Sequence, residues 1–189
     1  ALAVATGMRR GELFGLDWEH IKWNENLIQV RRELYWKFGK YHEKRKGEGS
    51  YVFVPPKSKK SIRDIDISPE LRRQLRGLYL RSKKKGLIFC TTAGTPLIPE
   101  NIVKRNFAAA LGRAEEQRAK DKLPPIGKVR WHDLRHTYGS LKLAQGENIY
   151  YVMRQMGHSS IQVTIDIYGH QIEERNPEAA AKTDAAIFG

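Results

Sequence analysis

Apolar residues recur at helical spacing through most of the chain and alternate with polar residues over one stretch near its start. The first 16 residues predict two short helices with a break at Thr6 and Gly7, after which Leu13 and Leu16 share one inward face. Later helices are expected from Pro69 into the basic run that ends at Gly86, from Pro99 past Ala114, over 131–144, 149–156 and 161–167, and from Pro177 onward. The chain is therefore predicted to be mainly helical.

The alternating stretch predicts three strands between residues 27 and 68. Their sequences are LIQVRREL, YVFVPP and IRDIDIS, and we expect them to form a small antiparallel sheet. A long basic loop over 35–50 separates the first two strands. Pro55 and Pro56 end the second strand, and a tight basic turn that contains Lys57 leads into the third. The predicted fold class is therefore α+β, mainly α with a small antiparallel β-sheet.

Two of the predicted helices carry apolar stripes that indicate packing in the core. In the first helix, the stripe is Leu71, Leu75, Leu78 and Tyr79. In the second helix, it is Val103, Phe107, Ala110, Leu111 and Ala114. Cys90 lies in an extended segment between them and is expected to be a buried apolar residue. A single cysteine excludes an internal disulfide and fits a reducing compartment.

The charge balance indicates a polyanionic partner. The 189 residues contain 34 Lys and Arg against 21 Asp and Glu, which gives a formal net charge of +13. With 40% hydrophobic residues and no apolar run near the ~20 residues that span a bilayer, the chain is predicted to form one globular domain without membrane association. A merely solvated basic surface, or attraction to acidic lipid, remains an alternative at this level.

Basic residues alternate with aromatic ones in the loop over 35–50, which suits contact with a nucleic-acid backbone. Further basic residues occupy the turn after Pro56 and the helix that begins at Pro99. The candidate DNA contacts are Lys37, Lys40, Lys44, Arg45, Lys59, Lys60, Lys104 and Arg105.

Several residues close to predicted helix ends can surround one anion without a metal. His132 and Arg135 lie three apart at a helix start, which places both side chains on one face of the first turn. His158 follows a helix bounded by glycine, and Tyr168 closes the next helix. These imidazole, guanidinium and phenol groups can all act on a phosphate. A zinc site is an alternative for the histidines, but no pair has HExxH or CxxC spacing.

Each of these side chains also has a purely structural interpretation. The alternatives are helix capping by His132 and His158, an ion pair of Arg135 with Asp133 or Glu147, and a core position for Tyr168 with its hydroxyl at the surface.

Arg9 lies in the first turn after the early helix break. A helix start already offers free N–H groups and the positive end of the dipole, so an arginine there is available for an anion. Glu12, three residues on, can hold the guanidinium in one orientation. The alternative is an ordinary surface ion pair.

Three segments together resemble the motifs of a known family. They are ATGMRRGELFGLDW, WHDLRHTYGS and MGHSSIQVTIDIYGH, and they are similar to the arginine, histidine–arginine and nucleophile boxes of the tyrosine recombinase (phage integrase) family. The resemblance implies the C-terminal catalytic domain of that family, with the fold of DNA breaking-rejoining enzymes. The positions that match its catalytic residues are Arg9, Lys57, His132, Arg135, His158 and the nucleophile Tyr168. Lys59 and Lys60 lie close to Lys57, and Glu12 and His136 are expected to support the site.

The resemblance implies a site-specific DNA recombinase of a phage or mobile element. Tyr168 would attack a DNA phosphodiester and form a 3′-phosphotyrosine bond, and the released 5′-hydroxyl would later reverse the step on another strand. Guanidinium groups can neutralise the transition-state charge, so no metal, ATP or other cofactor is expected. The chain has no GxxxxGK[ST] loop.

The resemblance also implies a role for each residue. Arg9 and Arg135 would bind the non-bridging oxygens, and His158 would donate a further hydrogen bond. His132 would accept the tyrosine proton, and Lys57 would protonate the departing 5′-oxygen. The arginines and histidines are expected to be preformed without DNA, whereas the nucleophile is the member expected to lie out of place.

Two departures from the family bear on the domain organisation. His20 stands where the family often has Asp, which is expected to alter packing or a helix end. Members usually carry an earlier helix and a separate N-terminal DNA-binding domain, so residues 1–189 are expected to be a catalytic domain with a truncated start. Residues 177–189 are expected to form a tail helix that docks on a neighbouring protomer.

The expected partner is double-stranded DNA, bound by a tetramer on two sites and by a protein that is monomeric without DNA. The expected location is the cytoplasm of a bacterial cell or a phage-infected host, with no membrane partner. Two other functions stay open. A type IB topoisomerase would rejoin the same strand, and a DNA-binding regulator would keep the fold without cleavage.

Overall fold

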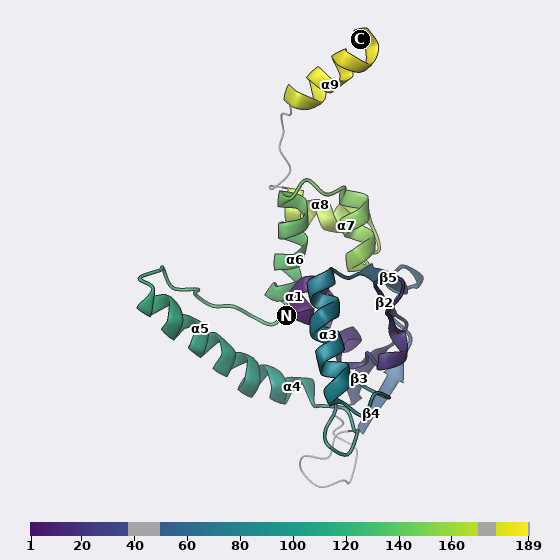
Figure 1. The fold of residues 1–189 in the computed structure, drawn as a ribbon, viewed down its shortest axis with the longest axis vertical. Helices are drawn as coiled ribbons and strands as arrows, with labels where there is room; N and C mark the ends of the chain where they lie inside the picture. The colour runs from purple at the N-terminus through teal and green to yellow at the C-terminus, as the bar shows by residue number, and fades with distance from the viewer. Residues whose placement is uncertain (38–49, 170–176, 189) are drawn as a thin grey trace.

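The computed structural model describes residues 1–37, 50–169 and 177–188. In these ranges the chain forms a body of short helices and two small sheets, followed by a group of three helices (Figure 1). The predicted mainly helical α+β class is therefore confirmed. None of the helices in these ranges is long and apolar enough to cross a membrane.

Helices occupy the segments that the apolar periodicity predicted. Those of the body are α1 (Leu2–Thr6), α2 (Arg10–Phe14), η1 (Trp18–His20), η2 (Lys59–Ser61) and α3 (Pro69–Arg81). Those that follow are α4 (Pro99–Asn101), η3 (Ile102–Phe107), α5 (Ala108–Lys120), α6 (Asp133–Ala144), α7 (Ile149–Met156), α8 (Ile161–Tyr168) and α9 (Pro177–Phe188). The bounds of α7 are those predicted, and α6 and α8 differ from the prediction only at one end.

Gly7 marks the predicted break between α1 and α2. It ends α1 in the left-handed conformation, with φ of 60°. A Cβ at this position would lie 2.6 Å from the ring of Tyr138 in α6, so glycine allows the turn to approach that helix closely. The turn between α1 and α2 therefore packs directly against α6.

The strands form two antiparallel sheets instead of the single sheet predicted. One has the order β1–β2–β5 and the other pairs β3 with β4. The strands are β1 (Ile21–Lys22), β2 (Leu27–Val30), β3 (Glu33–Lys37), β4 (Ser50–Val54) and β5 (Arg63–Asp66). The predicted first strand divides because Arg31 and Arg32 turn away from the ladder: Arg31 donates to the carbonyl of Arg63, and Arg32 donates to that of Gly15.

The core of the body lies between the three-stranded sheet and α3. Ile28 and Ile65 face each other across β2 and β5 and are fully buried. Leu71 and Leu75 of α3 are buried against them, as the stripe on this helix predicted. The hydroxyl of Ser68 caps α3 by accepting from the backbone N–H of Leu71 at 3.2 Å.

The helix formed by α4, η3 and α5 projects from the body (Figure 1). Its apolar stripe does not pack in the core as predicted, because no residue of η3 or α5 is buried. Phe107 instead packs edge-on against Trp131, with ring centroids 5.3 Å apart. Cys90, expected to be buried, is only half-buried.

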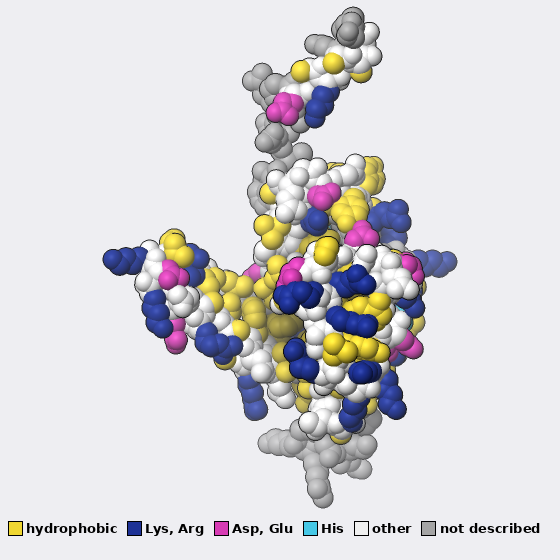
Figure 2. All heavy atoms as spheres, in the orientation of Figure 1, with side chains coloured by type: hydrophobic (Ala, Val, Ile, Leu, Met, Phe, Trp, Pro, Cys, Tyr) yellow, Lys and Arg dark blue, Asp and Glu magenta, His cyan; other side chains and the backbone are white. Residues whose placement is uncertain are grey.

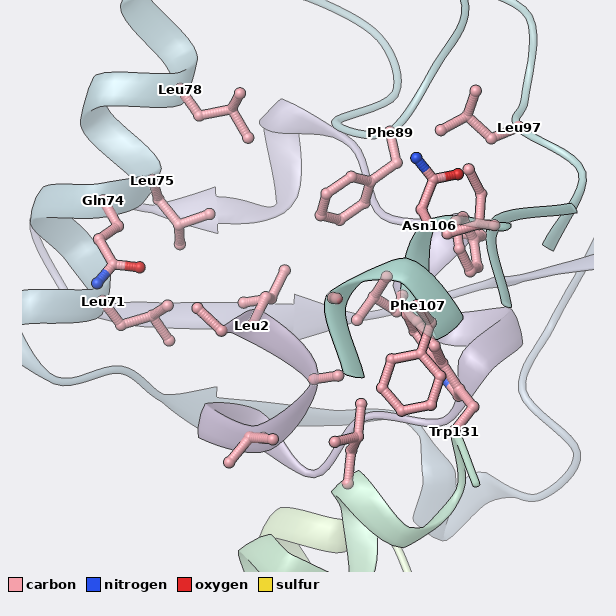
Figure 3. A pocket seen from close by; sticks show the side chains of 18 of the residues that line it. Leu2, Leu71, Gln74, Leu75, Leu78, Phe89, Leu97, Asn106, Phe107 and Trp131 are labelled. Atoms are coloured by element: carbon pink, nitrogen blue, oxygen red, sulfur yellow. The ribbon is translucent and has the colours of Figure 1, made fainter. Parts of the chain in front are cut away.

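Phe107 and Ala110 of this stripe line an open apolar groove of about 880 Å³. Figure 3 shows Leu2, Leu71 and Leu75 on one side of the groove and Phe107 and Trp131 on another. In Figure 2 the same groove appears as a band of hydrophobic surface between the projecting helix and the body.

The helical group of α6, α7 and α8 has a core of its own. It contains Tyr138, Leu143, Val152, Met156 and Tyr168, all buried. The group is joined to the body because α6 packs on α1 and α7 packs on β5. The tail helix α9 is present as predicted and lies apart from the other elements (Figure 1).

Candidate active site

Arg9 is the N-cap residue of α2 and is held from several directions. Its backbone N–H donates to Glu12 Oε2 at 2.8 Å, and its Nη1 donates to Glu12 Oε1 at 2.9 Å. Nη1 also lies 3.3 Å from the hydroxyl of Ser61, and Nη2 donates to the carbonyl of Gly157 at 2.7 Å. The guanidinium is therefore fixed next to His158 by a network that includes the buried Glu12, which is more than a simple surface ion pair.

Arg63 is a second arginine of the same network, and it was missed in the sequence. It is buried in β5, where Nη1 and Nη2 donate to the two oxygens of Glu12 at 2.9 Å each. Its Nε donates to the carbonyl of Gln155 at 2.6 Å. Arg63 lies two residues before Ile65, so both side chains are on the buried face of the strand. The strand pattern therefore indicated that Arg63 is a buried arginine.

Glu12 is thus shared by two arginines that lie far apart in the sequence. Its side chain is 1% exposed. Burial alone would raise the pKa of this carboxyl, but the hydrogen bonds and charges of Arg63 and Arg9 hold the pKa below its ordinary value. The carboxylate therefore stays ionised and links α2 to β5 and, through Arg63, to α7.

Arg135 reaches the same region from the first turn of α6. It is buried, and its Nη1 donates to the carbonyl of Gly7 at 2.5 Å. The alternative ion pairs are not formed, since Asp133 pairs with Arg130 and Glu147 with Lys142. Within the described residues no carboxylate pairs with Arg135. Burial and then the charge of Arg9 lower its pKa to about 9, so the group is cationic at neutral pH.

His158 lies buried in the turn after α7. Its Nδ1 is 2.9 Å from the hydroxyl of Thr164 in α8. Burial, followed by the charges of Arg135 and Arg9, lowers its pKa to about 4, so the ring is neutral at pH 7. When the Thr164 hydroxyl donates to Nδ1, the ring proton is on Nε2, which is then available as a neutral donor.

His132 and Tyr168 are not joined in the way the sequence predicted. His132 is the exposed N-cap residue of α6, with no side-chain capping bond. Partial burial and then the charges of His136 and Arg135 lower its pKa. The hydroxyl of Tyr168 instead lies 3.1 Å from Nδ1 of His136, so His136 contacts the tyrosine directly.

Tyr168 is 2% exposed and packs inside the helical group. Burial raises the pKa of its phenol, and the charge of Arg135 partly opposes this effect. Tyr168 occupies the core position that the structural interpretation gave it, but its hydroxyl contacts His136 and does not lie at the surface.

Lys57 lies in a connection between two sheets and not at a hairpin tip. β4 pairs with β3, and β5 pairs with β2, so the segment between them crosses from one sheet to the other. Lys57 and Lys59 are exposed. Lys60 is also exposed, and its Nζ donates to the carbonyl of Ser159 at 2.7 Å, next to His158.

The other basic candidates divide between exposed positions and residues whose side chains are not described. Lys104 and Arg105 are exposed on η3, and Lys37 is the last residue of β3. Lys40, Lys44 and Arg45 lie outside the described residues.

His20, the departure from the family pattern, contacts Asp17 with its Nδ1. Asp17 also pairs with Arg32. His20 therefore takes part in a local ion-pair network at the end of η1, away from the anion site.

The structure therefore gathers Arg9, Arg135 and His158, with Tyr168 beside Arg135. The nearby carboxylate, Glu12, is already occupied by Arg9 and Arg63. Uncompensated guanidinium charge, together with a neutral imidazole that can donate, is suited to bind a phosphodiester. Comparison with known proteins adds that the sequence profile of the phage integrase family matches residues 1–175.

The chain belongs to the phage integrase family. This integrase-family chain is 29% identical to the tyrosine recombinase XerC-like protein of Caldanaerobacter subterraneus subsp. tengcongensis, over 94% of this chain and 46% of that protein. It is also 29% identical to the ICEBs1 integrase of Bacillus subtilis (strain 168), over 97% of this chain and 47% of that protein. The chain thus spans about half the length of these curated relatives.

Solved structures share the fold. The integrase of transposon Tn1549 in complex with transposon right end DNA matches with a TM-score of 0.72 at 20% identity, over 98% of this chain and 56% of that chain. The catalytic domain of bacteriophage HP1 integrase matches with a TM-score of 0.55 at 24% identity, over 96% of this chain and 77% of that chain. The fold is therefore that of a tyrosine recombinase catalytic domain, as the motifs predicted.

Proposed function

We propose that this integrase-family domain is the catalytic part of a site-specific DNA recombinase that cleaves and rejoins DNA through a 3′-phosphotyrosine intermediate. The observation that carries the proposal is the convergence of Arg9, Arg135 and His158 beside the buried phenol of Tyr168. Two contacts support it: Arg9 donates to the carbonyl of Gly157, next to His158, and Arg135 donates to the carbonyl of Gly7, two residues before Arg9.

In the proposed reaction the oxygen of Tyr168 attacks the phosphorus of a DNA phosphodiester. A bond forms between this oxygen and the 3′-phosphate, and the bond from phosphorus to the 5′-oxygen breaks. The phenol proton passes to His132, which matches the family position of the base, while His136 contacts the hydroxyl. Lys57 supplies the proton that the departing 5′-oxygen takes up. Attack by a 5′-hydroxyl on the phosphotyrosine reverses these steps.

The cationic groups act on the charge that develops on the non-bridging oxygens. Arg9 and Arg135 are preorganised by their contacts with Glu12 and Gly7, so they need no rearrangement when the charge appears. Each such donor is worth about 2.7–4 kcal/mol of transition-state stabilisation, and general acid or base help contributes about 10²–10⁴-fold in rate. The summed stabilisation of the transition state lies within the range by which ordinary enzymes lower their barriers.

The test is a covalent protein–DNA adduct. The protein is incubated in EDTA with a pool of nicked duplexes of random sequence, so that a short cleaved strand diffuses away and traps the intermediate. We expect an adduct that survives denaturing electrophoresis, with the nucleotide attached to the peptide that contains Tyr168. A protein that binds the pool but yields no adduct would be a DNA-binding protein without this activity.

Strand exchange separates a recombinase from an enzyme that rejoins the same strand. Two duplexes selected from the adduct pool, one with a labelled strand, are mixed with the protein. We expect the label to appear in recombinant strands of both duplexes. Label that returns only to its original duplex would indicate topoisomerase-like rejoining.

The proposed partner is double-stranded DNA, with a tetramer assembled on two sites. The tail helix α9 supports assembly in trans, because it lies apart from its own body and exposes Ile187 by 66% (Figure 1). An Ala-rich helix of this length is marginal alone and is stabilised by docking. Deletion of residues 177–189 is expected to weaken assembly on DNA in sedimentation, whereas Lys182→Ala in the same helix is not. Equal assembly by all three proteins would contradict docking of the tail.

A further inference from the structure

Two residues of α6 form a closely fitted place for the side chain of Tyr168. His136 and Gly139 lie three apart, on one face of the helix. The hydroxyl of Tyr168 is 3.1 Å from His136 Nδ1. A Cβ on Gly139 would lie 2.6 Å from Cζ and 2.9 Å from both Cε2 and the hydroxyl oxygen of Tyr168. We call His136 and Gly139 the tyrosine seat.

The seat fits the polar end of the ring and not merely its apolar part. A glycine in the middle of a helix is less favourable than alanine by about 1 kcal/mol, so Gly139 weakens α6 unless the space it leaves is used. That space is taken by the hydroxyl end of Tyr168, next to an imidazole. A buried tyrosine hydroxyl needs a hydrogen-bond partner, and here His136 supplies it where Gly139 leaves the room.

We propose that His136 is the positioning residue of the nucleophile: its Nδ1 accepts the phenol hydrogen bond, and Gly139 leaves the room that lets Tyr168 rest beside Arg135. This inference rests on the proposed function of Tyr168 and names the residues that hold it. It differs from a role for His132, whose ring meets His136 edge-to-face at 4.8 Å between centroids and stands at the exposed start of α6.

The first test needs no DNA and no activity. Acceptance of the hydrogen bond at Nδ1 places the ring proton of His136 on Nε2. In the ¹⁵N-histidine-labelled protein we expect the Nδ1 resonance of His136 to show an unprotonated, hydrogen-bonded nitrogen. In Tyr168→Phe this resonance is expected to shift to the value of a free nitrogen. An unchanged resonance would show that the contact does not exist, and the proposal would be overturned.

The second test measures the effect on the reaction. Gly139→Ala would displace the ring, and a misplacement of about 1 Å can lower a rate about 100-fold. We expect that loss in the rate of adduct formation at saturating DNA, with the dissociation constant for DNA unchanged. Gly112→Ala in α5 is the matched control, because a Cβ at Gly112 meets nothing within 4 Å. A wild-type rate in Gly139→Ala would overturn the seat.

A second pair of variants covers the case in which Gly139→Ala does not fold. His136→Phe removes the acceptor and is expected to slow adduct formation about tenfold, the equivalent of one lost hydrogen bond. His136→Asn keeps an acceptor near the position of Nδ1 and is expected to recover most of the rate. Equal rates for both variants would show that His136 only fills space. If the wild-type protein forms no adduct, the proposed function fails, while the resonance of His136 still decides whether the seat exists.

Discussion

Replacement of Tyr168 by phenylalanine is expected to abolish the covalent adduct while leaving the fold and DNA binding in place. The ring of phenylalanine fits the space that Gly139 provides, so the core of the helical group is retained. The variant loses one hydrogen bond to His136, which is worth about 0.5–1.5 kcal/mol of stability. No other group can replace the phenol oxygen in the bond to phosphorus.

The control for this prediction is Tyr138→Phe. Tyr138 is buried in the same cluster and lies on α6 against Gly7. Tyr138→Phe therefore removes a hydroxyl from the same hydrophobic cluster as Tyr168→Phe does. Adduct formation by Tyr138→Phe is expected at the wild-type rate, and both variants should retain DNA binding in a gel-shift assay. An adduct of normal yield from Tyr168→Phe would assign the nucleophile to another residue.

Replacement of Arg63 by methionine is expected to lower the free energy of unfolding by about 3–5 kcal/mol. The change leaves the carboxylate of Glu12, 1% exposed, without two of its hydrogen bonds. It also leaves the carbonyl of Gln155 without its donor. Urea denaturation followed by circular dichroism measures the loss.

The double variant Glu12→Gln with Arg63→Met tests whether the loss comes from a stranded charge. We expect it to be more stable than Arg63→Met alone, because the buried carboxylate is gone. Arg73→Met is the surface control: its pair with Glu70 is exposed, and no measurable change is expected. A loss in Arg63→Met no larger than in Arg73→Met would contradict the structural role of the Glu12 pair.

The same pair predicts a dependence of stability on pH. The pKa of Glu12 is lower in the folded state than its ordinary value, so its contribution is complete above the ordinary carboxyl pKa. The contribution is lost as the pH falls toward the folded-state pKa. The double variant should therefore lose less stability than the wild type on acidification.

Local features of the chain were predictable from the sequence. The side-chain caps and apolar stripes of α3 and α7 act within a few residues, so the bounds of these helices follow from neighbouring positions. The split of the first strand was not predictable in this way. It depends on Arg31 and Arg32 reaching carbonyl groups in other parts of the body, which a pattern of alternation does not contain.

The site residues were also predictable only where local motifs identify them. The motifs pointed to Arg9 and Arg135 by type and spacing, and in the structure Arg135 donates to the carbonyl of Gly7, two residues before Arg9. The contact between Tyr168 and His136 depends on how α8 packs on α6. Residue spacing does not contain this packing, and the motif therefore pointed to His132 as the partner of the tyrosine. The apolar stripe that begins at Val103 was predicted to be core, because periodicity shows which face is apolar but not what covers it.

The hydrogen bond from Arg9 to Gly157 has a consequence for the order of folding. It joins residues 148 positions apart, and the bond from Arg135 to Gly7 joins residues 128 positions apart. Contacts of such high sequence separation form late, because a long loop must close before they stabilise anything. A nascent chain on the ribosome can therefore complete β1, β2 and β5 well before these contacts can form. The proposed anion site is thus complete only after the segment that contains Gly157 and His158 has been made.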